Sequence, residues 1–517
     1  MSATQAKRPN IVFAFGDDWG RYARAYAAVE GENSLSTHID TPNFDRVAAE
    51  GVLFTNAFVT SPSCTPCRSS VLSGRYFWEC GLGAILQGAV WDESIPTYPL
   101  LLEQAGYHIG YTYKVWGPGR PRNAPYGGER TQHQTRNWMA CFSQTATSLI
   151  DECGGVEEAK RRVYEEVHES FDQFLEARPD DSPFCYWWGP TNTHRKWQQG
   201  SGKNLWGLNP DDLEGKLPAF LPDVPEVRED VCDYLGECMA LDAGLGIILD
   251  KLERIGELDN TLVIVSGDHG IPGMPRGKCN LYDHGTEVPL AARWPGRIPA
   301  NRVVDDFVNI MDLAPTFLEA AGETPPECMS ARSLMPVLTS DKSGTVDPAR
   351  NFVVTGRERH VASAREGNLP YPQRSIRTSE YLYIINFEPN RWPMGDPQGL
   401  DDPATAPPSY EDLREDTHVA YPDLDASPTK AWMVHHRAEE TVAPLYELGF
   451  GKRPSEELYD LQNDPDLMRN IVEDPACAAV RDELRERLMR ELRKHDDPRV
   501  VQSPCPFENP PFTNLTN

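Results

Sequence analysis

Two short apolar segments, far apart in the chain, are each followed directly by acidic residues. Residues 10–15 precede the pair Asp17 and Asp18, and residues 261–265 precede Asp268. Short apolar runs ended by turn residues are typical of strands buried on both faces of a sheet. Parallel strands bring their carboxyl ends to one edge, where ligands bind. We therefore expect these carboxylates to meet although they are about half the chain apart.

The segments between these runs alternate in the same way. Residues 107–113 and 183–188 are predicted strands, and residues 98–105 and 227–255 have helical periodicity. Strands that alternate with helices indicate a largely parallel sheet covered on both faces. The expected fold class is therefore α/β, with a large, mostly parallel mixed sheet sandwiched by helices.

The composition changes after about Gly356. Three stretches rich in proline and acidic residues are expected to be loops: 370–374, 389–408 and 421–428. Residues 376–387 indicate a strand or hairpin, and residues 481–494 a charged amphipathic helix. We expect a catalytic α/β domain over residues 1–360 and a smaller carboxy-terminal α+β subdomain over residues 361–517.

The 517-residue chain is strongly acidic, with a formal net charge of −28. Such a charge repels nucleic acid and anionic membrane surfaces, so neither is expected as a partner. An anionic substrate would need a local basic pocket built from a few Arg and Lys side chains.

No apolar run approaches the ~20 residues of a membrane span, and residues 11–15 are too short for the core of a signal peptide. We expect a cytoplasmic protein if the chain is complete, and a periplasmic or secreted one if a signal was removed. The twelve cysteines are scattered and are expected to be mostly buried thiols. Cys64 and Cys67 form a single Cys-x-x-Cys, which without a second copy does not indicate a zinc ribbon.

The acidic residues at the two strand ends are candidate metal ligands. Asp17 and Asp18 alone could form a turn or a helix cap, and Asp268 with His269 could belong to an ordinary loop. Together they offer three carboxylates and one imidazole. An oxygen-rich set of this kind favours calcium or magnesium over zinc.

The most specific motif is SCTPCRSSVLSGR at residues 63–75. It contains Cys-x-Pro-x-Arg, beginning at Cys64, followed by Leu-Ser-Gly-Arg. Taken alone, the cysteine could be a buried thiol beside a loop proline. The longer pattern resembles the signature of type I sulfatases in the alkaline phosphatase superfamily. The resemblance implies that a formylglycine-generating enzyme oxidises Cys64 to formylglycine, whose hydrate attacks sulfur, and that Cys67 occupies a variable position.

The resemblance also assigns roles to residues outside this motif. It implies that calcium is bound by Asp17, Asp18, Asp268 and His269. It further implies that Arg68, Lys114 and Lys278 contact the nucleophile and the sulfate, and that His194 protonates the leaving group.

One position departs from the family pattern. The family has Gly-Lys-x-His where this chain has Tyr113-Lys114-Val115-Trp116. The family histidine assists breakdown of the sulfated intermediate, so another base, for which His284 is a candidate, is expected to act here.

Several local matches point to a branch of the family. Residues 356–360, 374–378 and 280–282 are similar to the heparan N-sulfatase-like branch, and residues 457–465 are typical of the sulfatase carboxy-terminal subdomain. The resemblance implies a sulfated carbohydrate as substrate. The candidates for gripping the sugar are Arg120, Arg122, His284, His360 and Arg374.

These observations predict a sulfuric ester hydrolase that cleaves a sulfate ester or an N-sulfo group on a sulfated glycan or oligosaccharide. Two alternatives stay open. One is a phosphonate or phosphodiester hydrolase of the same superfamily, and the other is a catalytically silent binder of sulfated glycans. Activity toward sulfates and phosphodiesters, and the chemical state of Cys64, distinguish the three.

Overall fold

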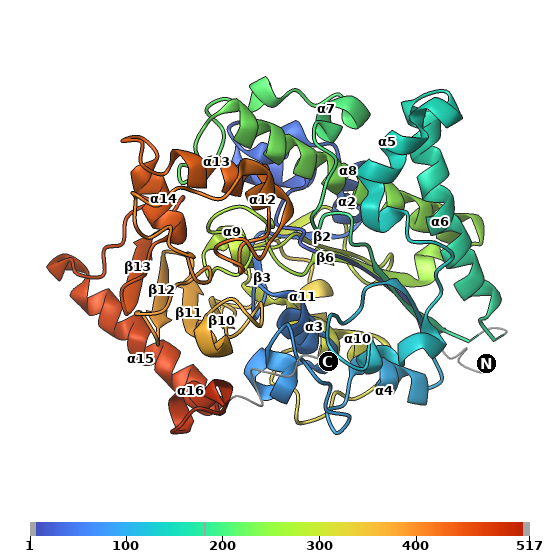
Figure 1. Cartoon of the computed structure of the whole chain (residues 1–517). Helices are drawn as coiled ribbons and strands as arrows, with labels where there is room; N and C mark the ends of the chain where they lie inside the picture. Colours follow the sequence, from blue (N-terminus) through green and yellow to red (C-terminus); the bar gives the residue numbers. More distant parts are fainter. Residues whose placement is uncertain (1–6, 180–181, 510–517) are drawn as a thin grey trace, which may run out of the picture.

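A computed structural model describes residues 7–179 and 182–509 (Figure 1). A large mixed sheet lies between layers of helices, and a smaller antiparallel sheet is built from the carboxy-terminal part of the chain. This arrangement confirms the predicted fold class.

The large sheet has seven strands, and its strand order brings distant segments together. In order across the sheet they are β4 (His108–Tyr113), β5 (Phe184–Gly189), β1 (Asn10–Gly16), β6 (Thr261–Gly267), β7 (Leu290–Arg293), β2 (Val52–Phe54) and β8 (Arg302–Val304). Strand β7 is antiparallel to both of its neighbours, and the other pairs are parallel. The strands predicted at residues 10–15 and 261–265 therefore lie side by side at the centre, as β1 and β6.

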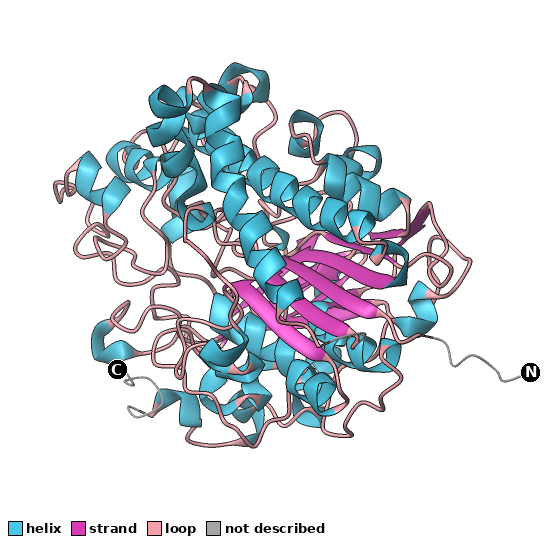
Figure 2. Ribbon diagram, turned by 90° about the vertical axis from the view of Figure 1, so that its right-hand side faces the viewer, coloured by secondary structure: helices cyan, strands magenta, loops and turns pink. Residues whose placement is uncertain are grey.

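Helices cover both faces of this sheet (Figure 2). Alternate residues of β1 face opposite sides: Val12 and Ala14 join one hydrophobic cluster, and Ile11, Phe13 and Phe15 join the other. The first cluster includes residues of α2 (Pro42–Ala49), α5 (Phe142–Cys153), α6 (Val156–Glu176) and α8 (Pro225–Arg254). The second includes residues of α3 (Cys64–Ser73), α4 (Tyr98–Gln104), α10 (Leu313–Ala320) and α11 (Met335–Leu338).

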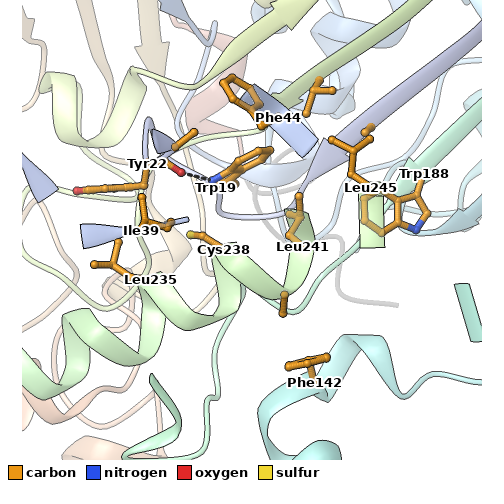
Figure 3. Packing of buried hydrophobic residues seen from close by; sticks show 14 of the residues in the cluster. Trp19, Tyr22, Ile39, Phe44, Phe142, Trp188, Leu235, Cys238, Leu241 and Leu245 are labelled. Atoms are coloured by element: carbon orange, nitrogen blue, oxygen red, sulfur yellow. Dashed lines mark hydrogen bonds between the residues drawn. The ribbon is translucent and has the colours of Figure 1, made fainter. Parts of the chain in front are cut away.

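The first face is closed by the long helix α8 (Figure 3). Leu241 and Leu245 of α8 are fully buried and belong to one cluster with Trp19 and Trp188. The ring of Trp19 packs edge-to-face on Phe44, and its indole nitrogen donates a hydrogen bond to a backbone carbonyl. This packing holds the segment directly after β1, which carries Asp17 and Asp18.

The smaller sheet is a four-stranded antiparallel meander packed against one helix. Its strands are β10 (Phe352–Arg357), β11 (Gln373–Thr378), β12 (Tyr381–Asn386) and β13 (Glu456–Asp460), and the helix is α15 (Ala478–Lys494). The leucines of α15 at positions 484, 488 and 492 are buried against the sheet. The predicted hairpin and amphipathic helix are both present here.

The described part of the chain also contains shorter strands and α-helices. They are β3 (Ala57–Phe58) and β9 (Val308–Asn309), with α1 (Ala27–Glu30), α7 (Ser201–Trp206), α9 (Asp283–Thr286), α12 (Tyr410–Glu415), α13 (Pro428–His436), α14 (Ala443–Phe450) and α16 (Pro498–Val501).

Two expectations for the carboxy-terminal part concern the loop at residues 370–374 and the boundary between the domains. The loop expected at residues 370–374 is shorter, because β11 begins at Gln373 and pairs with both β10 and β12. The first strand of the small sheet, β10, also precedes residue 361. The division of the chain into two domains near residue 360 stays a prediction.

Across residues 7–179 and 182–509, no helix is both long and apolar enough to cross a membrane. All twelve cysteines are free thiols, and seven of them are buried.

Leu488 tests the stability of the small sheet. This side chain is fully buried between α15 and the meander. Leu488→Ala leaves a cavity and should lower the free energy of unfolding by about 2–5 kcal/mol. The exposed Arg490 on the same helix is the control, since Arg490→Ala should change it by less than about 0.5 kcal/mol. Urea denaturation of both variants measures the difference, and equal values would contradict the packing described.

Candidate active site

The carboxyl ends of β1 and β6 bring the acidic residues together. Asp18 donates its backbone N–H to Asp268 Oδ1 over 2.7 Å. The approach is close because β6 ends in Gly267, where a Cβ atom would lie 1.9 Å from the carbonyl oxygen of Trp19. Asp18 itself has a φ of 55°, in the left-handed region that aspartate tolerates better than most residues. The expected meeting of the two acidic segments is therefore present.

Helix α3 brings Cys64 and Arg68 to the same place. All ten residues of α3 are buried, and Cys64 is the first of them. Arg68 follows one turn later, so both side chains lie on one face of the helix. The helix ends at Gly74, which has a φ of 65° and allows the chain to turn away. The amino-terminal end of α3 carries a partial positive charge next to Cys64.

Arg68 joins the two strand ends. Its guanidinium is fully buried, with Nε 2.8 Å from Asp268 Oδ2 and Nη2 3.1 Å from Asp17 Oδ1. Nη1 donates to the backbone carbonyl of Lys114, 3.0 Å away. One side chain therefore connects α3 with the segments that follow β1, β6 and β4.

Lys114 supplies a second positive charge at the same carboxylate. Its Nζ lies 2.7 and 2.8 Å from the two oxygens of Asp17. Burial alone would raise the pKa of Asp17, but Lys114 and Arg68 hold it well below its ordinary value. Asp17 is therefore a carboxylate at neutral pH.

Lys278 supplies the third positive charge, on the other side. Its Nζ lies 2.9 Å from Asp18 Oδ2 and 3.2 Å from Asp425 Oδ2. Sequence reasoning missed Asp425, because it lies in a proline-rich loop far from every recognisable motif. The only signal for it is spatial: the loop carries it to Lys278.

The two histidines present the same ring nitrogen to the acidic cluster. His269 Nδ1 contacts the carbonyl of Gly270 at 3.2 Å, and His194 Nδ1 contacts that of Arg195 at 2.6 Å. A carbonyl can only accept, so Nδ1 carries the proton in each ring. His269 Nε2 lies 3.2 Å from Asp18 Oδ1. His194 Nε2 lies 3.9 Å from Asp18 Oδ2.

These donors fit a hard divalent cation. Asp18, Asp268 and His269 are fully buried, and their ligand atoms lie with Cys64 Sγ within 4.8 Å of one another. A second group with the same spacing is formed by Asp17, Asp18 and His194. Carboxylate oxygens with one imidazole suit calcium or magnesium. The backbone hydrogen bond at Nδ1 of His269 orients its ring for such a role.

Cys64 lies against this cluster. Its Sγ is 3.4 Å from His269 Nε2 and 3.8 Å from Asp18 Oδ1. Burial and the neighbouring charge of Asp17 raise the pKa of the Cys64 thiol well above its ordinary value. Unmodified Cys64 is therefore a protonated thiol and a poor nucleophile.

Trp116, which stands where the family has histidine, is part of a hydrophobic core cluster. It is fully buried, stacks edge-to-face on Trp91, and donates from Nε1 to Ser69 Oγ over 2.8 Å. It therefore ties the segment after β4 to helix α3. Its ring belongs to the core and supplies no base.

The two remaining histidine candidates, His360 and His284, lie in different surroundings. His360 is buried beside the motif, with Nδ1 2.8 Å from Ser63 Oγ. His284 instead contacts the hydroxyl of Tyr22 at 3.1 Å and packs on Phe220, in a separate cavity of about 890 Å³. Neither contact connects His284 with Cys64, so the expectation that it replaces the family histidine gains no support.

Arg374 has a structural part in place of the expected sugar contact. It is fully buried, and its guanidinium is bound by Asp497 and Glu358 and stacks on Trp78. Arg120 and Arg122 are exposed in the loop that follows Lys114. Their contact with a sugar stays a prediction.

The sequence matches two family descriptions. The Sulfatase family matches residues 9–323, which is more than half of the chain. The description "N-sulphoglucosamine sulphohydrolase, C-terminal" matches residues 276–412. The first range contains all nine predicted catalytic and metal-binding residues, Cys64 among them.

Curated relatives match over nearly the whole chain. Human N-sulphoglucosamine sulphohydrolase is 26% identical, over 97% of this chain and 93% of its own. An ulvan-active sulfatase of Formosa agariphila is 25% identical, over 95% of this chain and 76% of its own.

Solved structures show the same fold. One, a complex with its substrate D-glucosamine-2-N,6-O-disulfate, has a TM-score of 0.64 at 19% identity and covers 96% of this chain and 100% of its own. The phosphonate monoester hydrolase of Agrobacterium radiobacter has a TM-score of 0.61 at 18% identity and covers 94% and 96%. The family match, the motif at Cys64 and the alkaline phosphatase-like fold lead to one conclusion: the chain belongs to the sulfatase family.

Proposed function

We propose that this enzyme hydrolyses a sulfate ester or N-sulfo group on a glucosamine-type sugar of a sulfated glycan or oligosaccharide. The observation that carries the proposal is the convergence of Cys64, Arg68, Lys114 and Lys278 on one buried carboxylate cluster. The similarity to N-sulphoglucosamine sulphohydrolase along nearly the whole chain supports the sugar class.

The nucleophile in this proposal is formylglycine, made from Cys64 by a formylglycine-generating enzyme. The raised pKa of the buried thiol supports this, since a protonated thiol would attack sulfur poorly. The cation in this proposal is calcium, held by Asp17, Asp18, Asp268 and His269. Bound there, it would act as a Lewis acid toward the sulfo group.

The positive side chains have separate tasks in the reaction. Lys114 and Lys278 bind the sulfo oxygens from opposite sides, because each is anchored on a different aspartate. Arg68 forms ion pairs with both Asp17 and Asp268, which fixes the two carboxylates relative to one another, and it lies beside residue 64. Fixed donors of this kind stabilise charge that develops on the equatorial oxygens.

Protons and bonds balance at residue 64. One hydroxyl of the hydrated aldehyde loses its proton to water and attacks sulfur, and the bond from sulfur to the leaving oxygen or nitrogen breaks. His194, acting as an imidazolium, gives that atom its Nε2 proton, while Nδ1 stays hydrogen-bonded to a backbone carbonyl. The second hydroxyl then gives its proton to the neutral His194, the carbonyl re-forms, the bond between carbon and the sulfated oxygen breaks, and sulfate leaves. Water restores the hydrate.

The domain division belongs to the same proposal. Residues 1–360 would form the catalytic domain, and residues 361–517 the subdomain that closes the site beside Lys278 through the loop bearing Asp425.

The first test separates Cys64 from Cys67. Cys64→Ala removes the precursor of the nucleophile and should lower kcat on N-sulfoglucosamine by at least about 1,000-fold. Cys67→Ser is the matched control, because Cys67 is equally buried but its thiol is assigned no step. Steady-state assays measure both. Normal kcat in Cys64→Ala would overturn the mechanism, and faster hydrolysis of a phosphodiester than of any sulfate by the unaltered enzyme would favour the superfamily alternative.

The second test concerns the cation. Asp268→Asn removes one negative ligand and also the partner of Arg68, so calcium affinity should fall at least about ten-fold together with turnover. Isothermal titration of calcium into chelator-treated enzyme reads affinity without turnover. Asp305→Asn, a change of the same kind in a loop after β8, should leave affinity unchanged. Full activity in chelator, with no metal retained, would contradict the assignment.

A further inference from the structure

Asp425 is a carboxylate of the site that neither family match covers, since those matches end at residues 323 and 412. It reaches Lys278 from the loop that precedes α13, at 3.2 Å. Lys278 therefore lies between two carboxylates, Asp18 and Asp425. Asp18 belongs to the proposed cation site, whereas Asp425 is not among its ligand atoms.

The loop that carries Asp425 is held from both sides. Asp423, two residues earlier, is fully buried and pairs with Arg357 and Arg365. Ser427, two residues later, donates to the carbonyl of Gly273 over 2.7 Å. These contacts on both sides of Asp425 therefore fix its position.

A buried lysine also binds the loop that carries Asp425. Lys430, in the first turn of α13, donates from Nζ to the carbonyl of Leu424 over 3.0 Å and lies close to Asp425. This side chain is fully buried and makes no ion pair within the described residues, and burial lowers its pKa to about 7. Its hydrogen bond to the backbone carbonyl next to Asp425 therefore helps to hold the loop in this conformation.

Asp425 is charged in the site. Burial alone would raise the pKa of this carboxyl, but Lys278, His194 and His360 around it hold the pKa far below its ordinary value. The same group therefore faces the lysine proposed to bind a sulfo oxygen and the histidine proposed to protonate the leaving group.

The charges around the nucleophile then nearly cancel. Four carboxylates, at positions 17, 18, 268 and 425, surround three permanently charged cations, at positions 68, 114 and 278. His194 is not counted, because its charge changes during the proposed reaction. A divalent cation turns one surplus negative charge into one surplus positive charge. A sulfate ester or sulfamate carries a single negative charge, whereas a phosphate monoester carries two. Without Asp425 the surplus would be two positive charges and would suit the doubly charged group.

We infer that Asp425 is a specificity-determining residue that matches the anion pocket to a singly charged sulfo group and disfavours doubly charged phosphate monoesters. The inference deepens the proposed function and rests on it. It assigns Asp425 no proton transfer and no metal contact. Its effect is electrostatic: it changes the difference in binding free energy between anions of unequal charge.

The test compares three aryl esters of matched leaving group: a sulfate, a phosphate monoester and a methyl phosphodiester. Asp425→Asn keeps the shape and removes the charge, so the ratio of kcat/KM for sulfate over phosphate monoester should fall about ten-fold. The ratio for sulfate over phosphodiester should stay within about two-fold, because both carry one charge. Asp425→Glu should keep the selectivity, and Asp401→Asn, an exposed aspartate in the same part of the chain, is the control.

A binding experiment reads the same effect without turnover. The affinities of benzylsulfonate and benzylphosphonate are measured by calorimetry, at a pH where the phosphonate is doubly ionised. Asp425→Asn should shift their ratio toward the phosphonate by a similar factor.

Equal weakening of all three esters and both ligands would mean that Asp425 only holds Lys278, and would overturn the inference. Unchanged ratios would overturn it as well. If the unaltered enzyme hydrolyses no sulfate, the proposed function fails, and the ratio of sulfonate to phosphonate affinity still decides whether Asp425 selects by charge.

Discussion

The buried ion pairs of Arg68 are the interaction on which the site depends. One guanidinium with no exposed surface joins Asp17 after β1 to Asp268 after β6, and also binds the backbone after β4. Removing one partner of such a buried pair typically costs about 3–5 kcal/mol, because the other charge is left uncompensated. The arginine of the Cys-x-Pro-x-Arg motif therefore joins helix α3 to the edge of the sheet one helical turn from Cys64.

The site also shows how an acidic protein can bind an anion. The chain has a net charge of −28, yet Lys114 and Lys278 are held at residue 64, each by an aspartate. These aspartates cancel much of the positive charge, so the pocket has no strong field of its own. A divalent cation bound at the proposed site would decide the sign of the charge of this pocket. The carboxy-terminal part contributes to this balance through Asp425, which lies in the loop before α13.

Much of this arrangement could be predicted from the sequence, for identifiable reasons. Buried parallel strands are short apolar runs, and β1 and β6 were recognisable from 10–15 and 261–265 alone. Residues with fixed spacing from Cys64 were recognisable through the family motif. Arg374 and His284 were expected at the sugar, but in the structure the first is enclosed by Asp497 and Glu358 and the second contacts Tyr22. Their surroundings come from distant segments, which no local pattern encodes, and Asp425 was missed for the same reason.

The central claim is that residue 64 acts as an aldehyde, and the mass of one peptide tests it most directly. Active enzyme, purified after co-expression with a formylglycine-generating enzyme, is digested, and the peptide that contains residues 64 and 67 is analysed by tandem mass spectrometry. The account predicts an aldehyde or its hydrate at Cys64 and an unmodified thiol at Cys67, with the modified fraction proportional to the specific activity of each preparation. Full activity in preparations where Cys64 is an unmodified thiol throughout would contradict the account.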